Sequence, residues 1–153
     1  MSQIADLLPA SNILVDVDAG SKARLFDAVA ALFEARRGLA RAAVVESLVA
    51  REKLGSTGLG QGIAIPHGRI KGLKEALGAF VRLQSPIAFD APDGKPVGQI
   101  FVLLVPEQAT EQHLQLLSEL AQMFSERRFR EQLANAPDAE RLRELFAQWA
   151  PKV

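Results

Sequence analysis

Residues 97–106 read VGQIFVLLVP, and six of them, IFVLLV at 100–105, form an unbroken apolar run. The run is rich in β-branched residues, and Gly98 and Pro106 bound it. A short run of this kind predicts a central β-strand with both faces buried, because a half-exposed strand would alternate apolar and polar residues. Burial of both faces requires helices on both sides of the sheet, so the run predicts an α/β sandwich.

Further strands and helices are predicted around this run. Strands are expected at 13–17, 63–65 and 77–83, the last alternating like a half-buried strand that leads to a turn at 93–94. Apolar spacing and end signals predict the following helices: a turn at 4–8, one from a Ser21 cap to Gly38, one at 41–53 with Gly55 as left-handed cap, one from a Thr110 cap to Phe124, one led by Ser125, and one after an Asp138 cap. Residues 1–153 are expected to form a single domain.

Composition narrows the class of protein. Lys plus Arg equals Asp plus Glu at 18 each, so there is no net charge to attract nucleic acid or an anionic membrane surface. The chain has no cysteine, which excludes disulfides, thiolate metal sites and a cysteine nucleophile. No apolar run approaches membrane-spanning length, and the N-terminus does not read as a signal peptide. These features lead us to expect a soluble cytoplasmic protein.

The stretch with the strongest functional signal is 51–69, REKLGSTGLGQGIAIPHGR. It holds five glycines, a Ser-Thr pair, and His67, one of only two histidines in the chain. Glycines at this density indicate that something approaches the backbone closely, since each one costs conformational entropy on folding. His67 is the reactive side chain placed to meet a molecule that approaches this backbone.

Several familiar motifs fail in this stretch. Gly55 and Gly60 have Walker A spacing, but Gln61 and Gly62 stand where Lys and Ser/Thr are required. Ile63 occupies the third glycine position of a dinucleotide fingerprint, and the order of elements is reversed. No nucleophile elbow surrounds Ser56, and two histidines without a zinc-binding motif make a metal site a poor interpretation. No cofactor is expected.

A histidine nucleophile remains. An imidazole nitrogen is nucleophilic near neutral pH, and a histidine that accepts a phosphoryl group divides one transfer into two. Such transfer requires cations and N–H donors around the phosphate oxygens, and Arg51, Ser56, Thr57 and the glycine amides are groups of that kind.

Arg51 and the second histidine, His113, each admit a structural interpretation. Arg51 falls in the last turn of a helix, where a cation complements the macrodipole. His113 follows the Thr110 cap by three residues and lies on the inward face of its helix, where a lone histidine is more often a hydrogen-bonded core residue.

The segment GSTGLGQGIAIPHG at 55–68 resembles the fructose/mannitol-type EIIA domains of the bacterial phosphotransferase system. The resemblance extends to nearly the whole chain and is strongest to the nitrogen-regulatory members. It is carried further by these segments: REK at 51–53, SPIAFDAPDGKPV at 85–97, FVLLVPE at 101–107 and TEQHL at 110–114. It implies a three-layer α/β/α sandwich with a mixed central sheet.

The resemblance also implies a mechanism. An HPr-type carrier phosphorylates the family's histidine at Nε2, which corresponds to His67, while Arg51 and His113 line the phosphohistidine site. We expect Arg51 to neutralise the phosphate, His113 to donate a hydrogen bond, and Ser56, Thr57 and Gly68 to orient the loop. The two imidazoles should then lie about 5 to 7 Å apart. The short basic segment RIKGLKEA at 69–76 departs from many members, so partner contacts are not carried across it.

Three functions stay open at this point. The first is a regulator whose phosphorylation state controls partners such as a sensor kinase or a potassium transporter. The second is the EIIA of a sugar permease, which passes phosphate to EIIB and on to fructose or mannitol. The third is a binding module in which both histidines are structural.

Overall fold

A central strand organises the sheet in the computed structural model, which describes residues 3–108 and 111–150. That strand, β6 (Val97–Pro106), pairs antiparallel with β5 (Leu77–Ile87) on one side. On its other side it pairs in parallel with β3 (Ile63–Ala64) and β4 (His67–Ile70). β1 (Ile13–Val17) lies parallel to β5, and β2 (Gly58–Gly60) lies antiparallel to β3. The order β1-β5-β6-β3-β2 confirms a mixed sheet.

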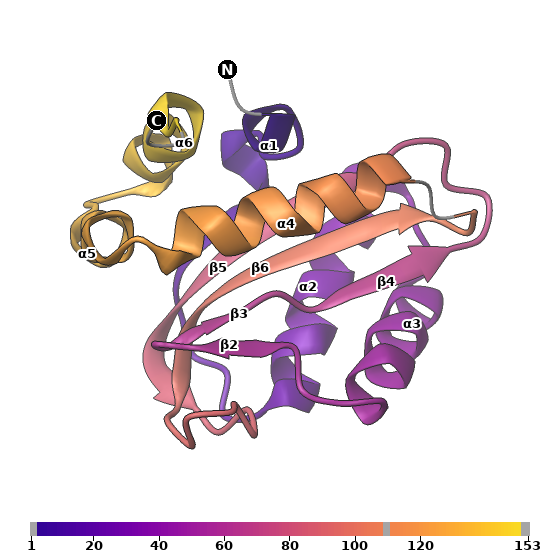
Figure 1. The fold of residues 1–153 in the computed structure, drawn as a ribbon. Helices are drawn as coiled ribbons and strands as arrows, with labels where there is room; N and C mark the ends of the chain where they lie inside the picture. The colour runs from indigo at the N-terminus through magenta and orange to yellow at the C-terminus, as the bar shows by residue number, and fades with distance from the viewer. Residues whose placement is uncertain (1–2, 109–110, 151–153) are drawn as a thin grey trace.

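Helices cover both faces of this sheet (Figure 1). One face packs against α2 (Lys22–Arg37) and α3 (Arg41–Lys53). The other packs against α1 (Gln3–Asp6), α4 (Glu111–Ser125), α5 (Arg127–Asn135) and α6 (Ala139–Gln148), with a short 3-10 helix, η1, at Ala10–Asn12. In β6, residues 100, 102 and 104 enter the first core and residues 101, 103 and 105 enter the second. The predicted strand with two buried faces and the three-layer sandwich are confirmed.

Most predicted helix ends are confirmed. Ser21 Oγ accepts from the Arg24 amide at 3.3 Å, Asp138 accepts from the Arg141 amide at 2.9 Å, and Gly38 adopts the left-handed conformation. The Thr110 cap lies outside the described residues. Ser125 ends α4 instead of leading α5.

The predicted left-handed cap at Gly55 is wrong. The C-cap of α3 is Leu54 in right-handed helical conformation, and Gly55 has φ 151°. The amides of Leu54 and Gly55 bond to the Arg51 and Glu52 carbonyls at 3.1 and 3.2 Å. These three-residue steps tighten the last turn and satisfy the helix end, and the positive φ of Gly55 lies far from the αL value of about 57°.

The prediction of a half-buried strand at 77–83 is also wrong in part. Residues 77–81 of β5 are all buried, with Ala79 and Val81 in one core and Phe80 in the other. The position between β1 and β6 explains this, because helices on both faces cover a central strand.

A strand interrupted at Ile65-Pro66 runs along one side of β6 as β3 and β4. Ile63 pairs with Gln99 and His67 pairs with Leu103, so β3 and β4 keep one register on β6. Pro66 has no N–H, but its carbonyl accepts from the Leu103 amide at 3.0 Å and bridges the gap. The prediction that His67 lies where a strand ends is therefore only half right, because a second segment starts at His67.

The predicted loop at 55–62 also contains a strand. β2 and β3 form a hairpin whose two turn residues, Gln61 and Gly62, have φ of 59° and 80°. Two positive φ values are the geometry of a tight hairpin turn, which explains a glycine here.

Among the described residues, no helix has the length and apolar character needed to span a bilayer.

Candidate active site

The ring of His67 is held at both nitrogens. Nδ1 lies 3.0 Å from the Ile65 carbonyl oxygen, and Arg51 Nε donates to His67 Nε2 over 3.3 Å. A carbonyl oxygen only accepts and a guanidinium only donates, so Nδ1 carries the proton and Nε2 carries the lone pair. The half-buried ring therefore presents Nε2 as its nucleophilic atom.

The pKa of His67 is lowered from its ordinary value near 6.5, chiefly because burial disfavours the charged imidazolium. The hydrogen bond to the Ile65 carbonyl raises the pKa, the Arg51 cation lowers it, and the charge of Glu52 raises it. The lowering prevails, so the imidazole is neutral at pH 7.

This direction predicts how stability depends on pH. The unfolded chain binds a proton at His67 near pH 6.5, whereas the folded protein does so only at lower pH. Between the two pKa values the unfolded state holds more protons, so the free energy of unfolding should fall as pH drops from about 6.5 through the folded pKa. We expect wild type to lose stability relative to His67→Gln in this window, measured by urea unfolding. An NMR titration that gave His67 a pKa above 6.5 would contradict the prediction.

Gly68 allows α3 to approach β4 closely. A Cβ placed on Gly68 would overlap the Ser47 Oγ and lie 3.1 Å from the Ser47 Cβ. Ser47 Oγ donates to the Arg69 carbonyl at 2.8 Å, which ties the helix to the strand. Arg51 lies one helical turn after Ser47, so the same approach brings its guanidinium to His67.

Gly68→Ala is expected to destabilise the fold by about 1–3 kcal/mol, the usual cost of overpacking. Urea unfolding measures this, and the penalty should shrink in a Ser47→Ala background, because that change removes the overlapping oxygen. Gly20→Ala is the matched control, since its Cβ would meet only the Arg24 guanidinium at 4.0 Å. An equal, small effect of both substitutions would refute the close approach.

Arg51 also binds the end of its own helix. Its Nη1 donates to the Gly55 carbonyl at 2.9 Å while its Nε donates to His67. The helix-end interpretation and the active-site interpretation therefore both describe real contacts of one side chain.

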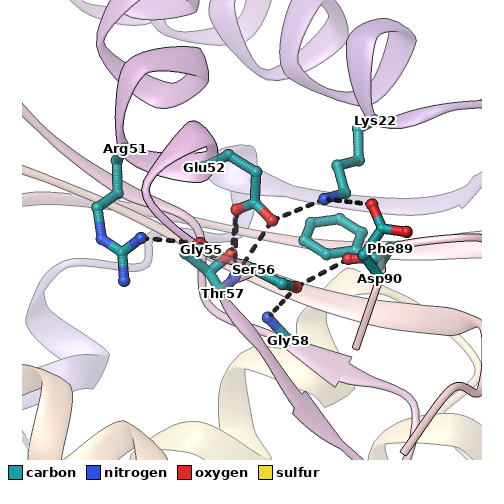
Figure 2. A network of polar contacts seen from close by, with 9 residues as sticks. All are labelled: Lys22, Arg51, Glu52, Gly55, Ser56, Thr57, Gly58, Phe89 and Asp90. Atoms are coloured by element: carbon teal, nitrogen blue, oxygen red, sulfur yellow. Dashed lines mark hydrogen bonds and ion pairs between the residues drawn. The ribbon is translucent and has the colours of Figure 1, made fainter. Parts of the chain in front are cut away.

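Ser56 and Thr57 hold the loop, and in the described part of the chain neither hydrogen-bonds directly to the His67 ring. Ser56 Oγ donates to the Phe89 carbonyl at 2.8 Å and accepts from the Gly58 amide at 3.0 Å. Thr57 is buried, and its Oγ1 donates to Glu52 Oε1 at 2.7 Å. Figure 2 shows these contacts around the turn that follows α3.

Sequence reasoning missed two residues here, Glu52 and Lys22. The Glu52 side chain is only 8% exposed, and Lys22 Nζ lies 2.8 Å from its Oε2. Lys22 also lies over the Phe89 ring, 4.6 Å from its centre, and 3.5 Å from Asp90 (Figure 2). The available signal was an acid in the last turn of a helix, where the macrodipole disfavours it.

His113 lines the cavity that holds His67. Arg51, His67, Gly68 and His113 all border this space of about 880 Å³, which lies between α3, β4 and the start of α4. Ser56 and Thr57 border a smaller adjoining cavity of about 200 Å³ that shares Arg51 and His67. The structure thus brings the six predicted residues to one region. The predicted distance between the two imidazoles stays a prediction.

His113 borders a second cavity as well. This space, of about 900 Å³, is lined by four cationic side chains, Arg36, Arg37, Lys74 and Arg143.

Within residues 3–108 and 111–150, no group of three or more His, Cys, Asp or Glu residues is arranged to hold a metal ion.

Comparison with known proteins places the chain in a family. Residues 6–149 match the model of the phosphoenolpyruvate-dependent sugar phosphotransferase system, EIIA 2. The chain is 45% identical over 152 residues to a "Nitrogen regulatory protein" of Pseudomonas aeruginosa, covering 95% of each. It is 36% identical over 108 residues to a "PTS system fructose-specific EIIA component" of Haloferax volcanii, covering 71% of this chain and 70% of that protein.

Solved structures agree. The crystal structure of nitrogen regulatory protein IIA-Ntr from Neisseria meningitidis has a TM-score of 0.90 and 54% identity, covering 95% of this chain and 99% of that one. The mannitol IIA of Escherichia coli has a TM-score of 0.74 at 21% identity, covering 90% and 97%, and so shares the fold. The chain therefore belongs to the EIIA type 2 family of the phosphoenolpyruvate-dependent sugar phosphotransferase system.

Proposed function

We propose that His67 accepts a phosphoryl group at Nε2 from a phosphorylated HPr-like carrier protein, and that its phosphorylation state regulates other proteins. The observation that supports this most is the pair of hydrogen bonds on the ring, which leave a neutral imidazole with its lone pair on Nε2 beside a guanidinium. In the transfer, the Nε2 lone pair forms the new N–P bond. The bond from phosphorus to the carrier's histidine breaks, and the carrier's imidazole leaves with that electron pair.

Arg51 has two tasks in this proposal. Before transfer its Nε donates to Nε2, so it must move aside by about one hydrogen-bond length for phosphorus to approach. After transfer its planar guanidinium pairs with the phosphoryl oxygens, and its Nη1 bond to Gly55 keeps the side chain near the site. His113, which borders the same cavity, donates a hydrogen bond to the phosphoryl group.

The rim of the cavity suits a protein donor. Leu54 and Leu114 border the His67 cavity and are 84% and 66% exposed. Exposed leucines around a reactive group favour docking of a protein surface, because burying them removes apolar area from water.

The regulatory role rests on the relatives. Those at 45% and 54% identity are named nitrogen regulatory proteins. A phosphoryl group adds roughly two negative charges at neutral pH, which is enough to create or repel a docking surface. We propose that a sensor kinase or a potassium transporter reads this charge in the cytoplasm, and that no nucleic acid or cofactor takes part.

The test is phosphorylation with purified components. The protein is mixed with phosphoenolpyruvate, Enzyme I and an HPr-type carrier, and mass spectrometry locates any acid-labile phosphate. We expect one phosphate on His67, with ³¹P and ¹⁵N NMR assigning it to Nε2. An unmodified wild type would overturn the proposal. Rapid loss of the phosphate to an EIIB and sugar would identify a permease component instead of a regulator.

A further inference from the structure

Two neighbours on α3, Arg51 and Glu52, are connected to different nitrogens of the His67 ring. Arg51 bonds Nε2 directly, and a chain of hydrogen bonds from Glu52 ends at Nδ1. We propose that Glu52 is a positioning residue, which fixes the tautomer and orientation of His67 through Thr57 and Ile65 and is itself held by Lys22. The consequence for phosphoryl transfer rests on the proposed function above, but the effect on the ring does not.

The first link is the Glu52 carboxylate. It accepts from Lys22 Nζ at 2.8 Å, from Thr57 Oγ1 at 2.7 Å, and from the Thr57 amide at 3.2 and 3.3 Å to its two oxygens. A carboxylate this buried is costly unless its oxygens are paired, so these donors fix its position. Figure 2 shows the carboxylate between Lys22 and Thr57.

The second link carries this position to the ring. The Thr57 carbonyl accepts from the Ile65 amide at 3.0 Å, and the Ile65 carbonyl accepts from His67 Nδ1 at 3.0 Å. Ile65 precedes Pro66, a context that restricts its backbone to extended conformations. The carbonyl that selects the Nδ1–H tautomer is therefore held on one side by the loop and on the other by Pro66.

The competing interpretation is that Glu52 and Lys22 only tie α3 to α2. The chain offers a matched control for this, because Glu34 on α2 pairs with Arg41 on α3 at 3.2 Å, and both side chains are exposed. Glu34→Gln breaks an ion pair between the same two helices without touching the chain of hydrogen bonds to His67.

The experiment uses unphosphorylated protein with ¹⁵N-labelled histidine. In wild type we expect an Nδ1-protonated, Nε2-unprotonated ring with a slowly exchanging Nδ1 proton. In Glu52→Gln and Thr57→Val the Nδ1 proton should exchange with solvent about tenfold faster, as expected for a weakened hydrogen-bond chain, and the Nε2–H tautomer should increase. Thr57→Ser should restore the wild-type signals, and Glu34→Gln should leave them unchanged.

The inference would be overturned if, in both Glu52→Gln and Thr57→Val, the Nδ1 proton exchanged at the wild-type rate and the ring kept the wild-type tautomer, whatever the stability of the variants. Should Glu52→Gln fail to fold, the Thr57→Val and Thr57→Ser pair decides. These signals need no phosphate donor, so a wild type that accepts no phosphate would refute the proposed function and leave this inference standing. If the proposed function holds, Glu52→Gln should also transfer phosphate more slowly and place a larger share on Nδ1.

Discussion

His67→Gln is expected to accept no phosphate from the carrier. Glutamine matches part of the imidazole's shape and can still hydrogen-bond, but its amide nitrogen is not nucleophilic, so no N–P bond forms. The half-buried ring lies at the start of β4 and makes two hydrogen bonds within the described part of the chain, so the variant should fold. The measurement is incorporation of ³²P from labelled phosphoenolpyruvate through Enzyme I and the carrier, with circular dichroism to verify folding.

His113→Gln is the control for that result. It removes the other histidine that lines the same cavity and keeps the proposed acceptor. We expect it to be labelled on His67, at a reduced rate because a donor to the phosphoryl group is lost. The acceptor would be His113 instead if folded His67→Gln protein were labelled while His113→Gln protein was not.

Arg51→Met is expected to lower the rate of phosphoryl transfer about 100- to 1,000-fold, the usual cost of removing a charged group that stabilises the transition state. Methionine is an unbranched side chain that fills similar space at this position of α3, but it leaves the phosphoryl oxygens without a cation. Arg51→Lys should fall between wild type and Arg51→Met, because lysine keeps the charge and loses the planar fork. Rapid-quench measurement of carrier-to-protein transfer at fixed carrier concentration gives these rates.

Arg41→Met serves as the comparison for Arg51→Met. Arg41 is an exposed cation on the same helix, and neither it nor its ion-pair partner Glu34 lines the cavity that holds His67. The rate of phosphoryl transfer to Arg41→Met should stay within about twofold of wild type, since surface ion pairs contribute little to stability. Equal rates for the two variants would remove Arg51 from the transfer step.

The elements that local pattern decides were predictable from the sequence. The apolar run at 100–105 has no polar position, so only a doubly covered strand fits it, and Ser21, Gly38 and Asp138 mark helix ends by local hydrogen bonding. The strand at 63–70 was harder to predict because its second half exists only through pairing with β6. Pro66 reads as a strand end locally, and the long-range register overrides it.

The same division applies to the site. The glycine-rich motif singled out His67, and the family resemblance assigned Arg51 to its site. Glu52 gave no comparable signal, since its role depends on Lys22, thirty residues earlier in the chain, and on a loop that folds back onto the end of α3. Ser56 and Thr57 were predicted to orient the loop, and their hydrogen bonds to Phe89 and Glu52 are consistent with that prediction.

The interruption at Pro66 has a consequence for how a phosphorylation signal can be sent. The sheet continues in register on both sides of the gap, so the backbone of His67 is fixed to Leu103 and has little freedom to shift. A phosphate on its ring would therefore change what a partner meets at the surface without a relay through the fold. A partner would therefore detect the phosphorylation state by binding at His67 itself, and selectivity among partners would depend on the shape and charge of each partner's surface.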